Sequence, residues 1–471
     1  MPISKIKNAP PEIFRDRFVL IGIIFSIWAF IKFLEFVLPE RVLEILPGPI
    51  ALSVFFIFIG IMASYMCITY FAQRWQARKK SKASKNLEFD QALHEERNSP
   101  PIDILIAAHN EQSVIVGTIE NLLEIDYPNF HITIADDRSS DGTAKLIEDF
   151  IQKNNLSSKI TLLRRFKGSV PGKAASLNEA IQTSKGELIA IFDADARVES
   201  NCLKLAVKYF KDPQVAAVQF QKKVRNADFN TLTFCQDLEF AYDTYLQIGR
   251  DSVNGFVELR GSGQIISRKC FEEVGLWDER SLTEDLEMST RININGWKIK
   301  PAPEIIAYEE GLIEPRAFIK QRRRWAEGSI RRYLTHINSF LNPKSKLTLI
   351  KRLDILPYLS QFAVPVWIFL DVLLEVYRFF TNQPTYITVL MLATVLVGTS
   401  MWMSICVGVR RWRDFSTLES IKYGTLAFFY GATHWPPIVL WTMRKIIFGR
   451  RPTQWIKTPR MLELVQDGGS K

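Results

Sequence analysis

The chain has 471 residues and a net charge of +10, with 47% hydrophobic and 23% charged residues. Its 32 Phe and 11 Trp argue against an intrinsically disordered or low-complexity protein, and its 5 scattered Cys argue against a disulfide framework or a cysteine-based zinc site. A mean hydropathy of 0.00 is high for a soluble enzyme and low for a transporter, so we expect a polar globular part joined to an apolar part.

Two apolar runs near the N-terminus, at 18–38 and 50–71, are each about 20 residues long, enough to cross a hydrocarbon core of about 30 Å. The strongly basic stretch 73–85 follows directly. The positive-inside rule places this stretch, and the polar region after it, in the cytoplasm. We therefore expect residues 1–85 to form two transmembrane helices and a basic cytoplasmic linker.

Beyond residue 100, short apolar runs alternate with amphipathic stretches. The runs 102–108, 131–135 and 187–192 are typical of buried strands, and the stretches between them are typical of helices. This alternation predicts βαβ units and therefore an α/β fold.

Polar side chains directly follow each of the three predicted strands: Asn110 and Glu111, Asp136 and Asp137, and Asp193 and Asp195. In open parallel sheets, ligands bind beyond the carboxyl ends of the strands. The pattern therefore predicts a nucleotide and metal site at this edge of the sheet.

Asp193 and Asp195 are separated by a single alanine. An Asp-x-Asp sequence also arises by chance in solvated turns. Here it follows a buried strand, where two adjacent carboxylates repel each other and a divalent cation relieves the repulsion. Mg²⁺ and Mn²⁺ prefer such oxygen ligands and commonly bridge to substrate phosphates. The position favours a metal site.

Two further acidic or basic groups lie where helices are predicted to begin. Lys173 precedes an amphipathic stretch, and a helix N-terminus attracts phosphate groups, although an exposed lysine of the first turn has the same pattern. Thr283 precedes Glu284 and Asp285, so a helix cap with acids in the first turn is the simplest interpretation. The chain contains neither GxxxxGK[ST] nor GxGxxG, which argues against a P-loop and a dinucleotide fold.

The C-terminal third begins with arginines around Trp325, a pattern typical of an interfacial helix on anionic lipid and also suited to a diphosphate leaving group. Three apolar segments follow, near 354–377, 386–408 and 424–443. Basic residues flank them, so both ends of this region are expected in the cytoplasm. Three full spans cannot begin and end on the same side, so one must be re-entrant or interfacial. The segment broken by His-Trp-Pro-Pro at 434–437 is our candidate.

Much of the basic charge thus flanks apolar segments, and we expect no nucleic-acid partner because no nucleic-acid-binding module occurs.

Six motifs in this order resemble family 2 glycosyltransferases with a GT-A fold, in the membrane-embedded branch: NE at 110–111, DD at 136–137, GKAxxLN at 172–178, DAD at 193–195, TED at 283–285 and QxxRW at 321–325. The resemblance implies a nucleotide-sugar-binding domain with a Rossmann-like mixed sheet. It also implies flanking transmembrane helices and a cytoplasmic catalytic domain in an integral multi-pass membrane protein. The expected domains are 1–85, the catalytic domain 86–345 with its interfacial helix, C-terminal transmembrane segments 346–450, and a cytoplasmic tail 451–471.

Four stretches are similar to β-monoglucosyldiacylglycerol synthases: 218–228, 239–247, 258–264 and 324–334. This similarity implies inverting transfer of glucose from UDP-glucose to 1,2-diacylglycerol at the lipid bilayer. The acidic motif TED departs from the TDD expected of those enzymes and matches the polymer synthases. The alternative is therefore a processive polysaccharide synthase of the cellulose, poly-N-acetylglucosamine or hyaluronan kind that also translocates its polymer.

The resemblance implies a role for each matching residue. On the donor side, Glu111 and Asp137 would hold the uridine, Lys173 a diphosphate or ribose oxygen, and Asp193 and Asp195 the nucleotide sugar with its Mg²⁺, or Mn²⁺ in its place.

On the acceptor side, Asp285 would be the general base, and Glu284, Gln321, Arg324 and Trp325 would line the acceptor site and support the leaving UDP. In the tail, Trp455, Thr458 and Arg460 resemble a gating loop, although a short basic loop is also typical of a solvated tail.

Overall fold

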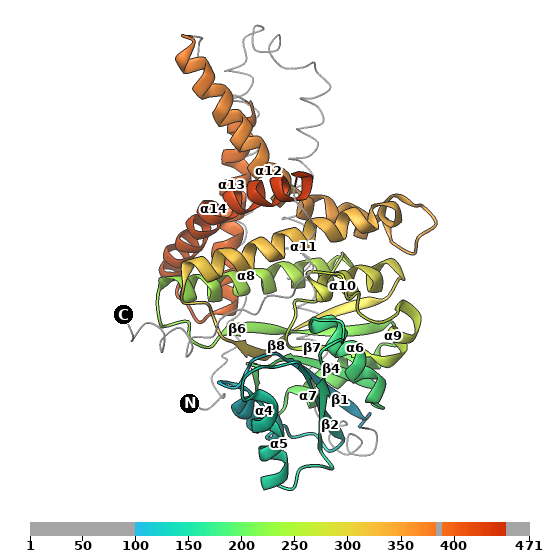
Figure 1. Ribbon diagram of the computed structural model, residues 1–471. Coiled ribbons are helices and arrows are strands. Elements are labelled where there is room, and N and C mark those ends of the chain that lie inside the picture. Colours follow the sequence, from blue (N-terminus) through green and yellow to red (C-terminus); the bar gives the residue numbers. More distant parts are fainter. Residues whose placement is uncertain (1–98, 383–388, 449–471) are drawn as a thin grey trace.

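The computed structural model describes residues 99–382 and 389–448 (Figure 1). Three predicted features lie outside these residues: the apolar run 18–38, the apolar run 50–71, and the candidate gating loop with Trp455, Thr458 and Arg460.

A mixed sheet of eight strands forms the centre of the described domain, in the order β3-β2-β1-β4-β7-β6-β8-β5. The strands are β1 (Ile102–Ala108), β2 (Phe130–Asp137), β3 (Ile160–Arg165), β4 (Leu188–Asp193), β5 (Arg197–Val198), β6 (Val215–Val224), β7 (Gln264–Ser267) and β8 (Lys298–Glu309). Strands β1 to β4 run parallel, whereas β7 is antiparallel to both β4 and β6. The α/β class and the three predicted strands, now β1, β2 and β4, are confirmed.

The helices form layers on both faces of this sheet and a further layer beyond it (Figure 1). They are α4 (Ile115–Leu123), α5 (Thr143–Lys153), α6 (Lys173–Thr183), α7 (Cys202–Val207), α8 (Thr231–Ser252), α9 (Arg268–Val274), α10 (Glu284–Ile294), α11 (Pro315–Leu341), α12 (Leu349–Phe380), α13 (Val389–Trp412) and α14 (Thr417–Phe448), with a short 3₁₀ turn, η2 (Lys208–Lys211). Buried side chains of α4, α5 and α7 share one core with the sheet, and those of α6, α9 and α10 share another. A third core joins α11, α12 and α14.

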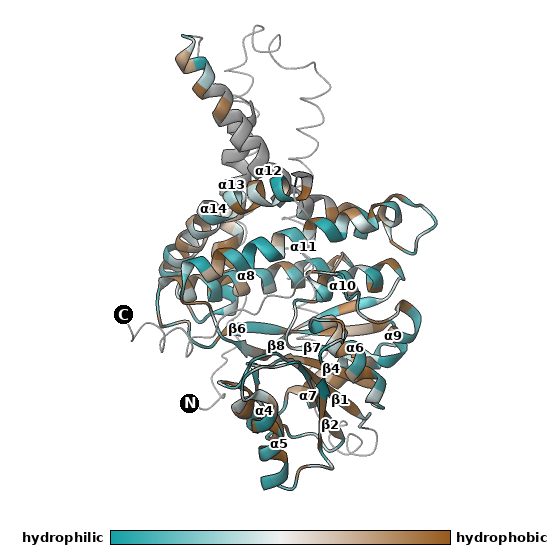
Figure 2. Ribbon diagram, viewed as in Figure 1, coloured by the Kyte–Doolittle hydropathy of each residue, from teal (hydrophilic) through white to brown (hydrophobic). Residues whose placement is uncertain are grey.

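The central strands are apolar on both faces because helices cover both. Along β1, Ile104 and Ile106 contribute to the core under α4 and α5, whereas Leu105 contributes to the core under α6 and α10. All three side chains are fully buried. Continuous apolar runs are expected of parallel strands covered on two sides, and the brown strands in Figure 2 show them.

The predicted C-terminal apolar segments 354–377, 386–408 and 424–443 fall on α12, α13 and α14. Among the helices of the described residues, none is both long and apolar enough to cross a membrane. The predicted C-terminal spans, and with them the multi-pass arrangement, are therefore not supported. Pro436 and Pro437, which we expected to break the last segment, lie inside the single helix α14.

Charged side chains in the first turns of α12 contact the domain built around the sheet. Lys351 Nζ donates to the backbone oxygen of Trp297 at 3.1 Å. Asp354 Oδ2 accepts from Arg250 Nε at 2.9 Å, and both side chains of this pair are buried. The predicted segment 354–377 thus begins with a residue that makes a polar contact with this domain.

Close packing of α11 on the start of α10 brings the two helices of the predicted acceptor side together. Gly328 of α11 lies against Thr283, and a Cβ at Gly328 would lie 2.5 Å from Thr283 Oγ1. Thr283 occupies the N-cap position of α10, but its side chain makes no capping hydrogen bond, so the predicted cap is wrong in this respect. Its hydroxyl is instead enclosed by the contact with α11.

We predict that Gly328→Ala pushes α11 away from α10, because a methyl group has no space there. The expected loss of stability is about 1–3 kcal/mol, as for other overpacked cores, with a parallel loss of activity. Thermal unfolding of the purified protein measures this. Gly431→Ala in α14 is the matched control, since no atom lies within 4 Å of its added Cβ. Equal stability of the two variants would contradict the proposed contact.

Candidate active site

The carboxyl ends of β1, β2 and β4 lie side by side and bring the predicted site residues to one edge of the sheet. In the β-sheet register, Ala108 pairs with Asp136 and Ala107 pairs with Asp193. The acidic pairs that follow β2 and β4 therefore lie on either side of the end of β1, as the sequence pattern predicts.

Asp137 is a buried carboxylate that accepts hydrogen bonds from two arginines and a backbone N–H. Its Oδ1 accepts from Arg165 Nη1 at 2.7 Å and from Arg138 Nε at 2.9 Å, and its Oδ2 accepts from the backbone N–H of Gly172 at 2.9 Å. These bonds join β2, β3 and the loop before α6. Sequence reasoning missed Arg165, because nothing near it in the sequence indicates that it faces Asp137.

Glu111 begins the turn before α4 and is 4% exposed. Its backbone N–H donates to Thr143 Oγ1 at 2.8 Å, which joins this turn to the start of α5. The fold thus holds Glu111 and Asp137 at neighbouring strand ends. Their role in binding uridine stays a prediction.

Lys173 is the first residue of α6, as predicted, and it lies between carboxylates from two other elements. Its Nζ is 2.6 Å from Asp193 Oδ1 and 3.3 Å from Glu284 Oε1. Burial acts to lower the pKa of Lys173, but Asp193 and Glu284 outweigh burial and raise it well above its usual value. The lysine therefore stays charged and links the end of β4 to the start of α10.

Asp193 is the last residue of β4 and Asp195 follows it, and loops from the other half of the sheet hold both. The backbone N–H of Asp193 donates to Ser262 Oγ at 3.0 Å, and Asp195 Oδ2 accepts from the backbone N–H of Glu310 at 3.3 Å. Glu309 lies near both acids: its burial and their negative charge raise its pKa, and an ion pair with Lys222 opposes the shift. The sequence pattern did not reveal Glu309 or Lys222.

The carboxylates of Asp193 and Asp195 suit a divalent cation whose other ligands come from the substrate and water. Within the described residues, no group of three or more His, Cys, Asp or Glu side chains is arranged to hold a metal. Asp193 and Asp195 supply two carboxylates, and the side chain of Asp193 remains 34% exposed. Mg²⁺ sites often use one or two carboxylates, with substrate phosphates and water completing the shell.

Asp285 lies in the first turn of α10, with its carboxyl close to the loop 258–264. Burial and the neighbouring Glu284 raise its pKa to about 6, and Lys173 limits the shift. A Cβ added at Gly261 would lie 3.5 Å from Asp285 Oδ2, so the lack of a side chain there keeps one side of the carboxyl open. A carboxyl with a pKa near neutrality is suited to general-base catalysis.

The predicted acceptor residues Gln321, Arg324 and Trp325 lie on α11, which packs against α10. Gly328 lies three residues after Trp325, so the contact with Thr283 brings this part of α11 next to the start of the helix that carries Asp285. The structure therefore brings both acceptor-side motifs to neighbouring elements.

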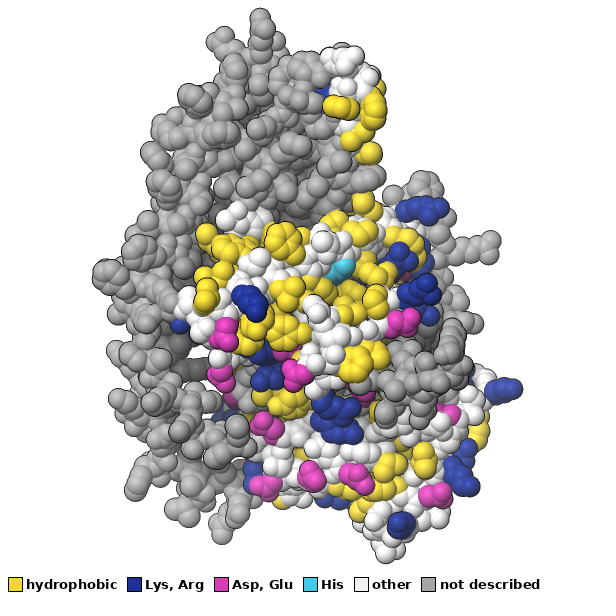
Figure 3. Space-filling view, turned by 90° about the vertical axis from the view of Figure 1, so that its left-hand side faces the viewer, with side chains coloured by type: hydrophobic (Ala, Val, Ile, Leu, Met, Phe, Trp, Pro, Cys, Tyr) yellow, Lys and Arg dark blue, Asp and Glu magenta, His cyan; other side chains and the backbone are white. Residues whose placement is uncertain are grey.

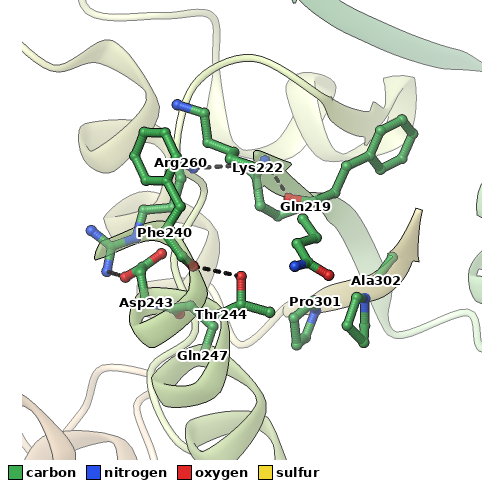
Figure 4. Close-up of a pocket in the computed structure, with 12 residues that line it drawn as sticks. Gln219, Lys222, Phe240, Asp243, Thr244, Gln247, Arg260, Pro301 and Ala302 are labelled. Carbon is green, nitrogen blue, oxygen red and sulfur yellow. Dashed lines mark hydrogen bonds and ion pairs between the residues drawn. The ribbon is translucent and has the colours of Figure 1, made fainter. Parts of the chain in front are cut away.

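A pocket with both polar and apolar lining residues lies between α8, β6, β8 and the loop 258–264 (Figure 4). Its lining residues are Gln219, Phe220, Gln221, Lys222, Phe240, Asp243, Thr244, Gln247, Arg260, Pro301, Ala302 and Pro303. Arg260 Nη2 pairs with Asp243 Oδ1 at 2.8 Å, and the Arg260 backbone N–H donates to Gln219 Oε1 at 2.6 Å. Burial raises the pKa of Asp243, and Arg260 opposes the shift.

Sequence reasoning did not assign this pocket to the site. The only signal was that all of its polar lining residues fall in stretches 218–228, 239–247 and 258–264, which carry the resemblance to glycolipid synthases.

Comparison with known proteins places the chain in a family. Residues 100–328 match the family described as glycosyltransferase like family 2. A β-monoglucosyldiacylglycerol synthase of Trichormus variabilis is 33% identical over 374 residues, which is 76% of each chain. The chain belongs to this glycosyltransferase family. It is therefore a nucleotide-sugar-dependent glycosyltransferase, and an inverting mechanism fits the family in general.

Two further comparisons define the fold and the range of relatives. A poly-β-1,6-N-acetyl-D-glucosamine synthase of Staphylococcus epidermidis is 29% identical over 232 residues, 48% of this chain and 54% of that protein. The structure of the mannosyltransferase PcManGT from Pyrobaculum calidifontis, in complex with GDP-Man and Mn²⁺, aligns with a TM-score of 0.52 at 19% identity, covering 80% of this chain and 99% of that one. This likeness supports the GT-A type of fold for the glycosyltransferase.

The pKa of Asp285 predicts the acid limb of the pH profile. If Asp285 takes a proton in the reaction, it must be ionised, so kcat/KM should fall about tenfold per pH unit below about 6. Glu284→Gln removes the negative charge that raises this pKa and should move the limb to lower pH. Glu148→Gln, at the exposed pair with Arg164, is the control. An acid limb that stays in place in Glu284→Gln would contradict the assignment.

Proposed function

We propose that this glycosyltransferase transfers glucose from UDP-glucose to 1,2-diacylglycerol and forms β-monoglucosyldiacylglycerol. The observation that carries the proposal is the extent of the similarity. Identity to the glycolipid synthase extends over 374 residues and 76% of each chain, whereas identity to the poly-N-acetylglucosamine synthase extends over 232 residues. The shared region thus reaches well beyond the segment that matches the family, 100–328.

In the proposed reaction, the acceptor hydroxyl attacks the anomeric carbon while Asp285 takes its proton. The bond between that carbon and the diphosphate breaks, and UDP leaves on the opposite side. The α-linked donor therefore gives a β-linked product in a single displacement, without a covalent enzyme intermediate. Two features of Asp285 support this role: its carboxyl lies beside Gly261, which has no side chain, and its pKa is near 6.

The other site residues would bind and orient the substrates. Glu111 and Asp137 would hold the uridine, and Lys173 would hold the donor diphosphate beside Asp193. The acceptor and the leaving UDP would meet the side chains of Glu284, Gln321, Arg324 and Trp325.

Asp193 and Asp195 would hold the divalent cation, which we propose is Mg²⁺, with Mn²⁺ as a substitute. When bound, the cation supplies positive charge that neutralises the diphosphate. Two adjacent carboxylates with room for phosphate oxygens support this assignment.

A lipid acceptor requires the site to work at a bilayer surface. Large apolar side chains are exposed on the C-terminal helices, among them Leu349 at 70%, Phe380 at 78% and Leu418 at 77%. In the view of Figure 3, hydrophobic side chains gather across the middle of the face. We propose that this helical layer contacts lipid, that the apolar runs 18–38 and 50–71 anchor the chain, and that the catalytic domain is cytoplasmic.

The second candidate function is processive polysaccharide synthesis. The TED motif at 283–285, which matches the polymer synthases, is the observation that favours it.

Product size separates the two candidates. Full-length protein in vesicles that contain diacylglycerol is incubated with radiolabelled UDP-glucose, and the lipid extract is analysed by mass spectrometry. We expect one β-linked glucose per lipid and no longer product at higher UDP-glucose, because the acyl chains keep the acceptor in the bilayer. Asp285→Asn should lower the rate by about 10²–10⁴-fold and serves as the blank. A ladder of oligosaccharides, or label in an insoluble polymer, would identify the second candidate.

Metal removal tests the role of the paired acids. EDTA should reduce transfer to background, and Mg²⁺ or Mn²⁺ should restore it, because an uncompensated diphosphate next to two carboxylates is repelled. Asp195→Asn should weaken the metal-dependent part of UDP binding, measured by calorimetry with and without Mg²⁺. If transfer continues undiminished in EDTA, Asp193 and Asp195 do not bind a metal that the reaction needs.

A further inference from the structure

Arg322, inside the QxxRW motif, is one of the most deeply buried large side chains among the described residues, at 1% exposure. Arginine stays protonated in proteins, so a buried arginine requires partners for its charge. Sequence analysis assigned roles to Gln321, Arg324 and Trp325 but none to this residue.

The Arg322 guanidinium contacts two of those predicted site residues at once. Its Nη1 donates to Gln321 Oε1 at 2.6 Å, and its plane lies over the Trp325 ring with 4.1 Å between the guanidinium carbon and the ring centroid. The ring of Phe318 lies at 4.6 Å, one turn earlier on α11. Residues three or four positions apart share a helix face, so Arg322 and these rings form one stack.

Two other helices determine where the guanidinium lies. Arg322 Nη2 donates to Glu239 Oε2 of α8 at 2.7 Å, and the hydroxyl of Tyr430 on α14 donates to the same oxygen at 3.1 Å. The carboxylate therefore receives bonds from two directions, and the guanidinium that it holds has little freedom to rotate. A flat, forked cation fixed in this way constrains both the amide of Gln321 and the plane of Trp325.

We propose that Arg322 is a positioning residue, which orients Gln321 and Trp325 for sugar transfer and is itself oriented by Glu239 and Tyr430. The inference rests on the proposed role of Gln321 and Trp325 in the reaction. It adds that α8 and α14, far apart in the sequence, control the geometry of the site through one side chain.

The adjacent Arg323 has a different partner, on α14. Its guanidinium lies over the ring of Trp441 on α14, at 4.5 Å, and it therefore packs α11 on α14. Arg322→Lys and Arg323→Lys are a matched pair, since each keeps the charge and removes the flat fork and its stacking.

We expect Arg322→Lys to lower kcat by about 10- to 100-fold, because small misplacements of reacting groups cost rates of this size. KM for the nucleotide sugar and the unfolding temperature should change little, and Arg323→Lys should keep close to wild-type kcat. Tyr430→Phe leaves the ion pair of Arg322 with Glu239 intact and should lower kcat by a smaller factor. This second variant keeps the test valid if Arg322→Lys folds poorly.

A double-mutant cycle with Trp325→Leu shows whether Arg322 acts through the tryptophan. If it does, Arg322→Lys should have little further effect in the Trp325→Leu protein, because the group that it positions is already absent. The cycle uses whichever acceptor the wild-type enzyme glycosylates, so failure of the diacylglycerol assignment does not affect it. Independent effects of Arg322→Lys and Trp325→Leu, or equal losses in Arg322→Lys and Arg323→Lys that follow the unfolding temperature, would overturn the proposal.

Discussion

A single ammonium group joins the parts of the active site. Lys173 Nζ lies 2.6 Å from Asp193 Oδ1 and 3.3 Å from Glu284 Oε1, so it links the starts of α6 and α10 to the end of β4. Without this cation, three carboxylates including Asp285 would repel each other across a partly buried site. These two ion pairs hold the proposed donor and base residues close together.

A buried ion cluster around Glu258 contacts the helix that carries Asp285, the proposed base. Glu258 is fully buried and accepts from Arg332 at 2.6 Å and from Arg250 at 3.1 Å, with Arg260 at 3.3 Å. Burial alone would raise its pKa, but these three cations lower it to about 2. Arg332 Nη1 also donates to the backbone oxygen of Leu286 at 3.1 Å, next to Asp285 in the sequence. The cluster therefore fastens α8 and α11 to the helix that carries the proposed base.

The two halves of the sheet position different parts of the proposed site. The parallel half, β3-β2-β1-β4, ends in the acids proposed to bind the nucleotide and metal, and the first four of the six family motifs lie in or next to this half. The mixed half, β7-β6-β8-β5, supports α8, α10 and α11, where the acceptor is proposed to bind. Glycolipid and polysaccharide synthases need the same donor chemistry and differ in the acceptor. We therefore expect the features that decide between them in the second half.

The sequence by itself determined the strands β1, β2 and β4, their acidic ends, the position of Lys173 at a helix start and the family. These features depend on local patterns: apolar runs, the residues that follow them, and motif order. Only the tertiary structure decided that Arg165 holds Asp137, that Glu309 lies near the acids proposed to bind metal, and that Arg322 lies over the Trp325 ring. It also decided that Arg322 and Tyr430 of α14 both bind Glu239 of α8. These contacts depend on strand order and helix packing, which join residues far apart in the chain, and no local pattern of side chains encodes that order.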